Sequence, residues 1–320
     1  MRKKKRLKKG PIIIFILLIL IVIGGIGVKK YIEYINSYKY KLKKVGYETE
    51  QIEKIEKLKT DTIDYILTLK KDDYIVKLIN QKYFIESNLK KYLKYKKTGK
   101  KDITDTIAIV NVGADNDWYT NTKKTDTSLK ELMLTNKFYY LDESYNSDNM
   151  VKVSNTYSYG SSQMLTEDTF NAFKEMWKAA KDEGLSLIIN SSFRSYEEQE
   201  EVYEYYKATK GEEAADLIAA HAGFSEHQTG MAIDIQTKGS RAATFEEFDE
   251  FKWLEKNAYK YGFILRYPKD KEYLTGYEYE SWHFRYVGKE AAKYIQENKI
   301  TFDEYYAYFI EVKNEKEKKN

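Results

Sequence analysis

The apolar residues are arranged in three different ways along the chain, and the first is a continuous run. The seventeen residues 12–28 contain no charged or hydrogen-bonding side chain and follow a strongly basic segment. A run of this length is at the lower limit for a membrane-spanning helix. Basic flanks stay on the cytoplasmic side, so we predict a cytoplasmic tail over residues 1–10 and a transmembrane signal-anchor over residues 11–28. A cleaved signal peptide is the alternative, although no clear Ala-x-Ala site follows the run.

The second arrangement is periodic and extends over residues 29–105. Apolar residues recur there at steps of three and four among many charges, which is typical of amphipathic helices. Proline is absent between Pro11 and Pro268, so nothing interrupts a helix in this range. We predict a helical membrane-proximal region, based on Ile52, Ile55, Leu58, Ile63, Ile66, Leu67 and Leu69.

The third arrangement begins near residue 106 and mixes short apolar runs with amphipathic stretches. Thr166–Glu183 has a candidate cap in Thr166 and an apolar stripe from Phe170 to Ala180, and Gly184 ends it. Without a regular βαβ repeat, this mixture predicts an α+β domain over residues 106–311, followed by a charged tail over residues 312–320. We expect further helices at Glu197–Lys207, Glu212–Ala220 and Phe245–Tyr261, and strands at Ile107–Val112, Leu185–Ile189, Met231–Ile235 and His283–Val287.

Composition and charge exclude several functional classes. The chain of 320 residues has 42% hydrophobic and 32% charged residues, as globular proteins do. Seven of its first nine residues are basic, and removing these seven from the overall charge of +4 leaves about −3 for the rest. This balance offers no basic surface for nucleic acid. Cysteine is absent, which excludes disulfides, thiolate metal sites and cysteine nucleophiles.

The candidate chemistry lies in two short segments that contain two of the three histidines. The first is Ser225-Glu-His-Gln-Thr-Gly-Met-Ala-Ile-Asp234, and the second is Glu280-Ser-Trp-His283. His227, Asp234 and His283 are residue types that bind Zn²⁺, and three protein ligands with an open fourth position are typical of a catalytic zinc. Glu280, three residues before His283, is then placed to act as the general base. The segments therefore predict a metallohydrolase.

The spacing of the ligands sets a condition on the backbone. His227 and Asp234 are seven residues apart and cannot share one ion on a continuous strand or helix. We therefore expect a turn at Gly230, between a loop that carries His227 and a strand that carries Asp234. His221 is a rival ligand, but no carboxylate accompanies it in a comparable pattern.

These segments closely resemble the VanY-like D-alanyl-D-alanine carboxypeptidases, which belong to the LAS group of zinc peptidases. The similarity continues in Ser191-Ser-Phe-Arg-Ser-Tyr-Glu-Glu-Gln199 and in Tyr261-Gly-Phe-Ile-Leu-Arg-Tyr-Pro268 with Thr275-Gly-Tyr277, and it covers roughly residues 132–309. One departure is Ala222-Gly223, where many relatives have proline before the glycine. The resemblance implies a small antiparallel sheet flanked by helices.

The resemblance also implies roles for individual residues. His227, Asp234 and His283 match the zinc ligands, and Glu280 matches the catalytic base. Arg194 matches the arginine that stabilises the scissile carbonyl as it becomes an oxyanion. Gln199 and Ser225 occupy positions that contact substrate in the family.

The implied function is zinc-dependent removal of the terminal D-alanine from peptidoglycan stem peptides. It agrees with the predicted topology, a single-pass protein of the cell membrane whose catalytic domain faces a Gram-positive-type envelope. Two alternatives remain within the enzyme class, namely L,D-carboxypeptidase action and endopeptidase cleavage of peptidoglycan. The alternative of another class is a non-catalytic protein that binds the cell wall.

Overall fold

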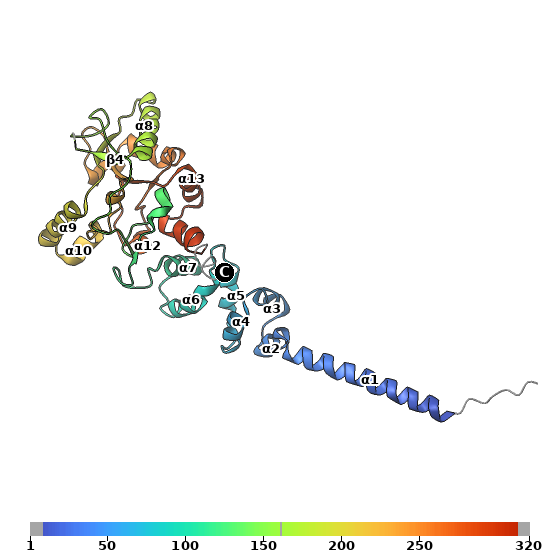
Figure 1. Ribbon diagram of the computed structural model, residues 1–320. Coiled ribbons are helices and arrows are strands. Elements are labelled where there is room, and N and C mark those ends of the chain that lie inside the picture. The colour runs from blue at the N-terminus through green and yellow to red at the C-terminus, as the bar shows by residue number, and fades with distance from the viewer. Residues whose placement is uncertain (1–8, 161, 313–320) are drawn as a thin grey trace, which may run out of the picture. The chain divides into compact units, whose positions relative to one another are not determined.

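The computed structural model describes residues 9–160 and 162–312, and the chain divides into two compact units, residues 1–93 and 94–320 (Figure 1). The predicted terminal tails, residues 1–10 and 312–320, fall almost entirely outside the described residues.

In the described part of the first unit, the regular elements are helices, as the spacing predicted. Leu42, Ile52, Ile55, Ile63 and Ile66 are all buried. Short connections separate the helices, and one of them is Gly46, whose left-handed backbone ends α2. The helices are α1 (Lys9–Asn36), α2 (Tyr38–Val45), α3 (Thr49–Ile55), α4 (Thr60–Leu67), α5 (Asp73–Ile79), η1 (Glu86–Asn88) and α6 (Leu89–Lys96), which ends in the second unit.

Helix α1 covers the apolar run that was predicted to span a membrane. Within the described residues, the search for a helix with the length and hydropathy of a membrane span finds none. The transmembrane prediction over residues 11–28 is therefore not confirmed. Part of it falls outside the description, which omits the side chains of residues 11–14, 16, 17 and 20.

A four-stranded antiparallel sheet organises the second unit, in the order β5-β6-β8-β7. This sheet and the helices around it confirm the predicted α+β class. Its strands are β5 (Ile188–Ser191), β6 (Ala232–Gln236), β7 (Phe263–Leu265) and β8 (His283–Tyr286). Two small sheets accompany it, a parallel pair of β1 (Lys123–Lys124) with β2 (Tyr139–Tyr140) and an antiparallel pair of β3 (Met150–Lys152) with β4 (Met164–Thr166).

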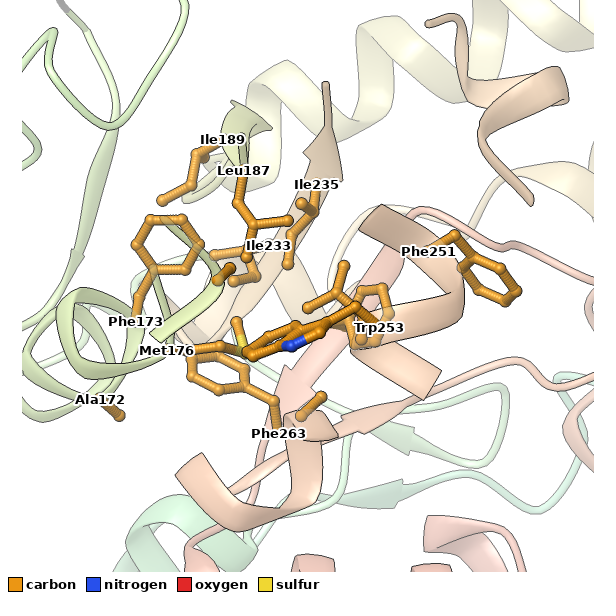
Figure 2. Close-up of a cluster of buried hydrophobic side chains, with 14 of the residues drawn as sticks. Ala172, Phe173, Met176, Leu187, Ile189, Ile233, Ile235, Phe251, Trp253 and Phe263 are labelled. Carbon is orange, nitrogen blue, oxygen red and sulfur yellow. The ribbon is translucent and has the colours of Figure 1, made fainter. Parts of the chain in front are cut away.

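One face of the four-stranded sheet is covered by α8 (Glu167–Asp182) and α11 (Asp249–Asn257). Figure 2 shows Phe173 and Met176 of α8 against Ile233 and Ile235 of β6, in a core that also contains Phe284. Side chains alternate between the two faces of a strand. Burial of Ile233 and Ile235 on this face therefore turns Asp234 to the opposite face.

The remaining elements of the second unit are helical, and α9 and α10 pack side by side (Figure 1). Together they are α7 (Ile103–Val112), η2 (Thr127–Leu132), α9 (Tyr196–Lys210), α10 (Glu212–Ile218), η3 (Glu226–Thr229), η4 (Ala242–Glu247), η5 (Ala258–Tyr261), α12 (Glu272–Thr275), α13 (Lys289–Asn298), α14 (Phe302–Tyr305) and η6 (Tyr306–Glu311).

Three predicted elements differ from the structure. Ile107–Val112 is part of α7 and not a strand, because Asp102 caps the helix start through the Asp105 amide and Gly113 ends it in the left-handed conformation. The strand predicted at Leu185–Ile189 begins only at Ile188 and has a bulge before Ser191. The helix predicted at Phe245–Tyr261 is divided, since Phe248 takes an extended backbone between η4 and α11.

Candidate metal centre and active site

The sheet and one short turn bring the three predicted ligands together. Asp234 in β6 lies directly opposite His283, the first residue of β8. His227 lies in η3, which ends at Gly230 with a φ of 67°. This left-handed backbone favours glycine, and a Cβ here would also displace the Met150 side chain, whose sulfur would lie 2.6 Å away. The predicted turn between His227 and Asp234 is therefore present.

The ligand atoms of the three residues surround a common point. Asp234 Oδ1 is 3.5 Å from His227 Nε2 and 3.4 Å from His283 Nδ1. One ligand atom from each residue lies within 4.8 Å of the other two. Asp234 Oδ1 is buried and has no hydrogen-bond partner in the described part of the chain. Two imidazoles and a carboxylate with such an unpaired oxygen fit a divalent metal, and they suit zinc.

His227 is oriented by a backbone carbonyl. Its Nδ1 lies 2.6 Å from the Ser192 carbonyl oxygen, which can only accept, so Nδ1 carries the proton. Nε2 is left with a lone pair that points to the centre. Burial lowers the pKa of His227 and outweighs Asp234, which acts to raise it. The lowered pKa favours the neutral imidazole that a metal requires.

The other two ligands stabilise each other in the metal-free protein. Burial opposes the charged form of Asp234, but the neighbouring His227 and His283 outweigh it and hold the Asp234 pKa below its usual range. Burial also opposes the charged form of His283, yet the nearby carboxylates of Asp234, Glu226 and Glu280 outweigh it and raise its pKa to about 9. A metal ion would replace the proton on His283, so we expect metal binding to release a proton.

Glu280 lies beside the cluster in the turn before β8. Its Oε2 is 3.3 Å from His283 Nδ1, and its own amide donates to the Tyr267 carbonyl at 3.1 Å. Burial raises the pKa of Glu280 to about 8 in the metal-free protein, and the proximity of Asp234 adds to this shift. A bound cation would lower that value. The pKa of Glu280 is thus close to neutral pH, where a carboxylate can both accept and release a proton.

Arg194 approaches from the loop between β5 and α9. Its guanidinium donates to Gln199 Oε1 at 2.7 Å and to Ser191 Oγ at 3.1 Å. Gln199 in turn donates to the Ala220 carbonyl at 2.7 Å, so its amide connects Arg194 to the segment after α10. Ser225 caps η3 by accepting from the His227 amide at 3.3 Å. Gln199 and Ser225 thus also hold Arg194 and His227 in place.

All seven predicted site residues line one cavity of about 230 Å³. It also contains the rings of Tyr267, Tyr277 and Trp282. Trp282 is partly buried against the core of the sheet, so the same residue packs the fold and borders the site. The cavity joins a candidate metal centre, a carboxylate and a cationic donor in one place.

The rival ligand His221 lies outside this cluster. Its Nε2 is 2.9 Å from Asp216 Oδ1, and its ring stacks on Tyr119 at a centroid distance of 3.8 Å. The assumption that no carboxylate accompanies His221 is therefore wrong, since Asp216 pairs with it. His221 and Asp216 lie beside Tyr119, apart from the three candidate ligands.

A buried ionic network lies beneath the site and was not predicted from the sequence. Glu226 accepts from Arg266 Nε at 2.7 Å and lies 3.2 Å from Arg285 Nη1, while Asp303 accepts from Arg266 Nη1 at 2.6 Å. The four side chains are at most 1% exposed. Arg285 interrupts the apolar strand His283–Val287, and that interruption was the available signal.

The chain is similar to several known proteins. The family model described as VanY, D-alanyl-D-alanine carboxypeptidase, matches residues 162–289. The chain is 42% identical over 181 residues to YodJ of Bacillus subtilis (strain 168), covering 55% of the chain and 66% of YodJ. It is 36% identical over 145 residues to VanXYC of Enterococcus gallinarum, a bifunctional D-Ala-D-Ala dipeptidase and D-Ala-D-Ala carboxypeptidase, covering 43% of the chain and 76% of VanXYC.

Among solved structures, the LD-carboxypeptidase LdcB is similar, with 39% identity and a TM-score of 0.56 over 60% of this chain and 94% of LdcB. Fold and site thus define an α+β protein with a candidate His–Asp–His metal centre. The chain belongs to the VanY family of D-alanyl-D-alanine carboxypeptidases. It spans 66% of the length of YodJ, slightly less than two thirds.

Proposed function

We propose that this protein is a zinc-dependent D-alanyl-D-alanine carboxypeptidase that removes the C-terminal D-alanine from peptidoglycan stem peptides. The observation that carries the proposal is the convergence of His227, Asp234, His283, Glu280 and Arg194 on one cavity. Membership of the VanY family and the activity named for VanXYC support it.

The proposed chemistry divides between the metal and the chain. His227, Asp234 and His283 would hold zinc, which lowers the pKa of water and polarises a carbonyl oxygen. Glu280 takes the proton from the attacking water and returns it to the leaving amine of D-alanine. Arg194 donates to the carbonyl oxygen as negative charge develops on it. Burial of His227, His283 and Glu280 strengthens their electrostatic contacts, because buried charges are screened less than exposed ones.

The substrate gives the reason for the proposed location. Assembled peptidoglycan lies outside the cytoplasmic membrane, so we infer that residues 106–311 act on the extracytoplasmic side of a Gram-positive-type envelope. The basic residues before the apolar run support this orientation. Protease treatment of intact cells that carry an epitope after residue 312 tests it. Loss of the epitope is expected, and full protection would contradict the location.

L,D-carboxypeptidase action is the second candidate, and the similarity to LdcB favours it. The two activities differ in substrate, since a D,D-enzyme shortens a pentapeptide ending in D-Ala-D-Ala and an L,D-enzyme shortens the tetrapeptide. Zinc-loaded full-length protein incubated with defined tri-, tetra- and pentapeptides, followed by mass analysis, separates them. We expect loss of one alanine from the pentapeptide and a stop at the tetrapeptide.

The same assay tests the class of enzyme. Removal of zinc with a chelator should stop the reaction, and added zinc should restore it. Turnover that persists without metal would contradict the zinc mechanism. A protein that binds the peptides and cleaves none of them would instead be the non-catalytic cell-wall-binding protein.

A further inference from the structure

The two histidines of the metal centre are supported from behind in different ways. His227 uses Nε2 toward the centre and gives its Nδ1 proton to the neutral carbonyl of Ser192. His283 is reversed, because Nδ1 faces Asp234 and Glu280 while Nε2 faces Glu226 Oε2 at 3.7 Å. The group behind His283 is therefore a carboxylate.

Both atoms of this facing pair lack another partner. Glu226 Oε2 and His283 Nε2 are buried, and neither has a hydrogen-bond partner among the residues described. Buried polar groups are nearly always paired, and leaving one unpaired is costly. A shift of less than 1 Å would bring these two atoms into hydrogen-bonding distance, at about 2.9 Å. The geometry indicates that each atom is the intended partner of the other.

The charge of Glu226 is maintained by the network beneath it. Its other oxygen, Oε1, contacts Arg266 Nε at 2.7 Å and Arg285 Nη1 at 3.2 Å. These two ion pairs are buried, and paired guanidinium groups stabilise the charged form of a buried carboxylate. The carboxylate is thus an ionised acceptor with one oxygen fixed by cations and the other directed at His283.

The arginines are fixed in turn by groups outside the candidate ligand set. Arg266 pairs with Asp303 of α14 through two contacts, at 2.6 and 3.2 Å. Arg285 donates to the Met133 carbonyl at 2.8 Å. The Arg266 guanidinium also lies over the Tyr267 ring, whose centroid is 4.9 Å from that of His283. The acceptor behind His283 therefore cannot move freely.

We propose that Glu226 is a positioning residue for the metal centre: it accepts the Nε2 proton of His283, fixes which ring nitrogen faces the metal and strengthens the hold on zinc. The inference rests on the zinc site of the proposed function. Carboxylates behind ligating histidines increase the basicity of the ligand, and their loss typically weakens metal binding by about 10–100-fold. Glu226 is outside the candidate ligand set and acts through His283.

The test compares two variants that each remove one carboxylate from Arg266. Glu226→Gln removes the acceptor behind His283, whereas Asp303→Asn removes a charge of the same network that does not face a ligand. Zinc dissociation constants of the full-length proteins are measured by competition with a chromophoric chelator. We expect Glu226→Gln to weaken zinc binding by about 10–100-fold and Asp303→Asn to change it by less than about threefold.

A structural role alone predicts a different result, because both variants would then affect stability and zinc binding in parallel. Thermal unfolding of the metal-free proteins measures that stability separately. If Glu226→Gln does not fold, Glu226→Gln/Arg285→Gln keeps the buried charge balanced and replaces it in the same titration. Unchanged zinc affinity in a folded Glu226 variant would overturn the inference. Failure of the unmodified protein to bind zinc would instead overturn the proposed function.

Discussion

The two faces of the four-stranded sheet carry opposite kinds of side chain from the same strands. On one face, Ile233 and Ile235 are buried in the apolar core that α8 and α11 cover. On the other face, the intervening Asp234 lies opposite His283 and contributes to the metal centre. One residue along the strand thus changes the environment from hydrocarbon to a cluster of charges.

This contrast assigns stability and chemistry to different residues. The apolar face gains free energy from burial. The polar face buries charges, which destabilise a fold unless they are paired. If the division is correct, substitutions on the two faces should have separable effects.

The largest expected effect is on the polar face. Glu280→Gln keeps the size of the side chain but removes the proton acceptor, so we expect kcat/KM for the pentapeptide to fall by about 10²–10⁴-fold. Zinc content should remain that of the unmodified protein, because Glu280 is outside the predicted ligand set. Steady-state kinetics and metal analysis measure the two quantities. Full activity in this variant would reject Glu280 as the base.

The matching change on the apolar face is Ile235→Ala. Ile235 is fully buried, and such truncations usually lower the free energy of unfolding by about 2–5 kcal/mol. We expect that loss in urea unfolding, together with nearly unchanged kcat/KM at a temperature where the variant is folded. A large fall in kcat/KM of the folded variant would show that the two faces are coupled.

Arg194 tests the polar face through a second group. Arg194→Ala removes the donor to the developing oxyanion, and loss of such a donor typically costs about 10²–10³-fold in kcat. Arg194→Lys keeps the positive charge but loses the fork that binds Gln199 and Ser191, so we expect an intermediate rate. Equal rates for both variants would show that the positive charge contributes nothing without the geometry of the guanidinium group.

The same contrast explains which features could be predicted from the sequence. His227, Gly230 and Asp234 are close in the chain, so the need for a turn followed from their spacing alone. The Glu226 network was missed because Arg266 is 40 residues from Glu226 and Asp303 is a further 37 residues away. Pairing over such distances depends on tertiary structure. Ile107–Val112 was assigned to a strand because burial on nearly all sides removes the periodicity that distinguishes a helix.

The most gradual expected effect concerns the stability of the metal-free protein as pH changes. Unfolded Glu280 releases its proton near its ordinary pKa of 4.5, whereas burial keeps it protonated in the folded protein up to about pH 8. Between these values the folded state binds more protons, so stability falls as pH rises, by at most about 1.4 kcal/mol per pH unit from this group. Glu280→Gln removes this contribution, and its unfolding free energy should exceed that of the unmodified protein increasingly from pH 4.5 to 8. Bound zinc stabilises the carboxylate and should reduce the difference. Parallel urea-unfolding curves for the two metal-free proteins across this range would contradict the raised pKa.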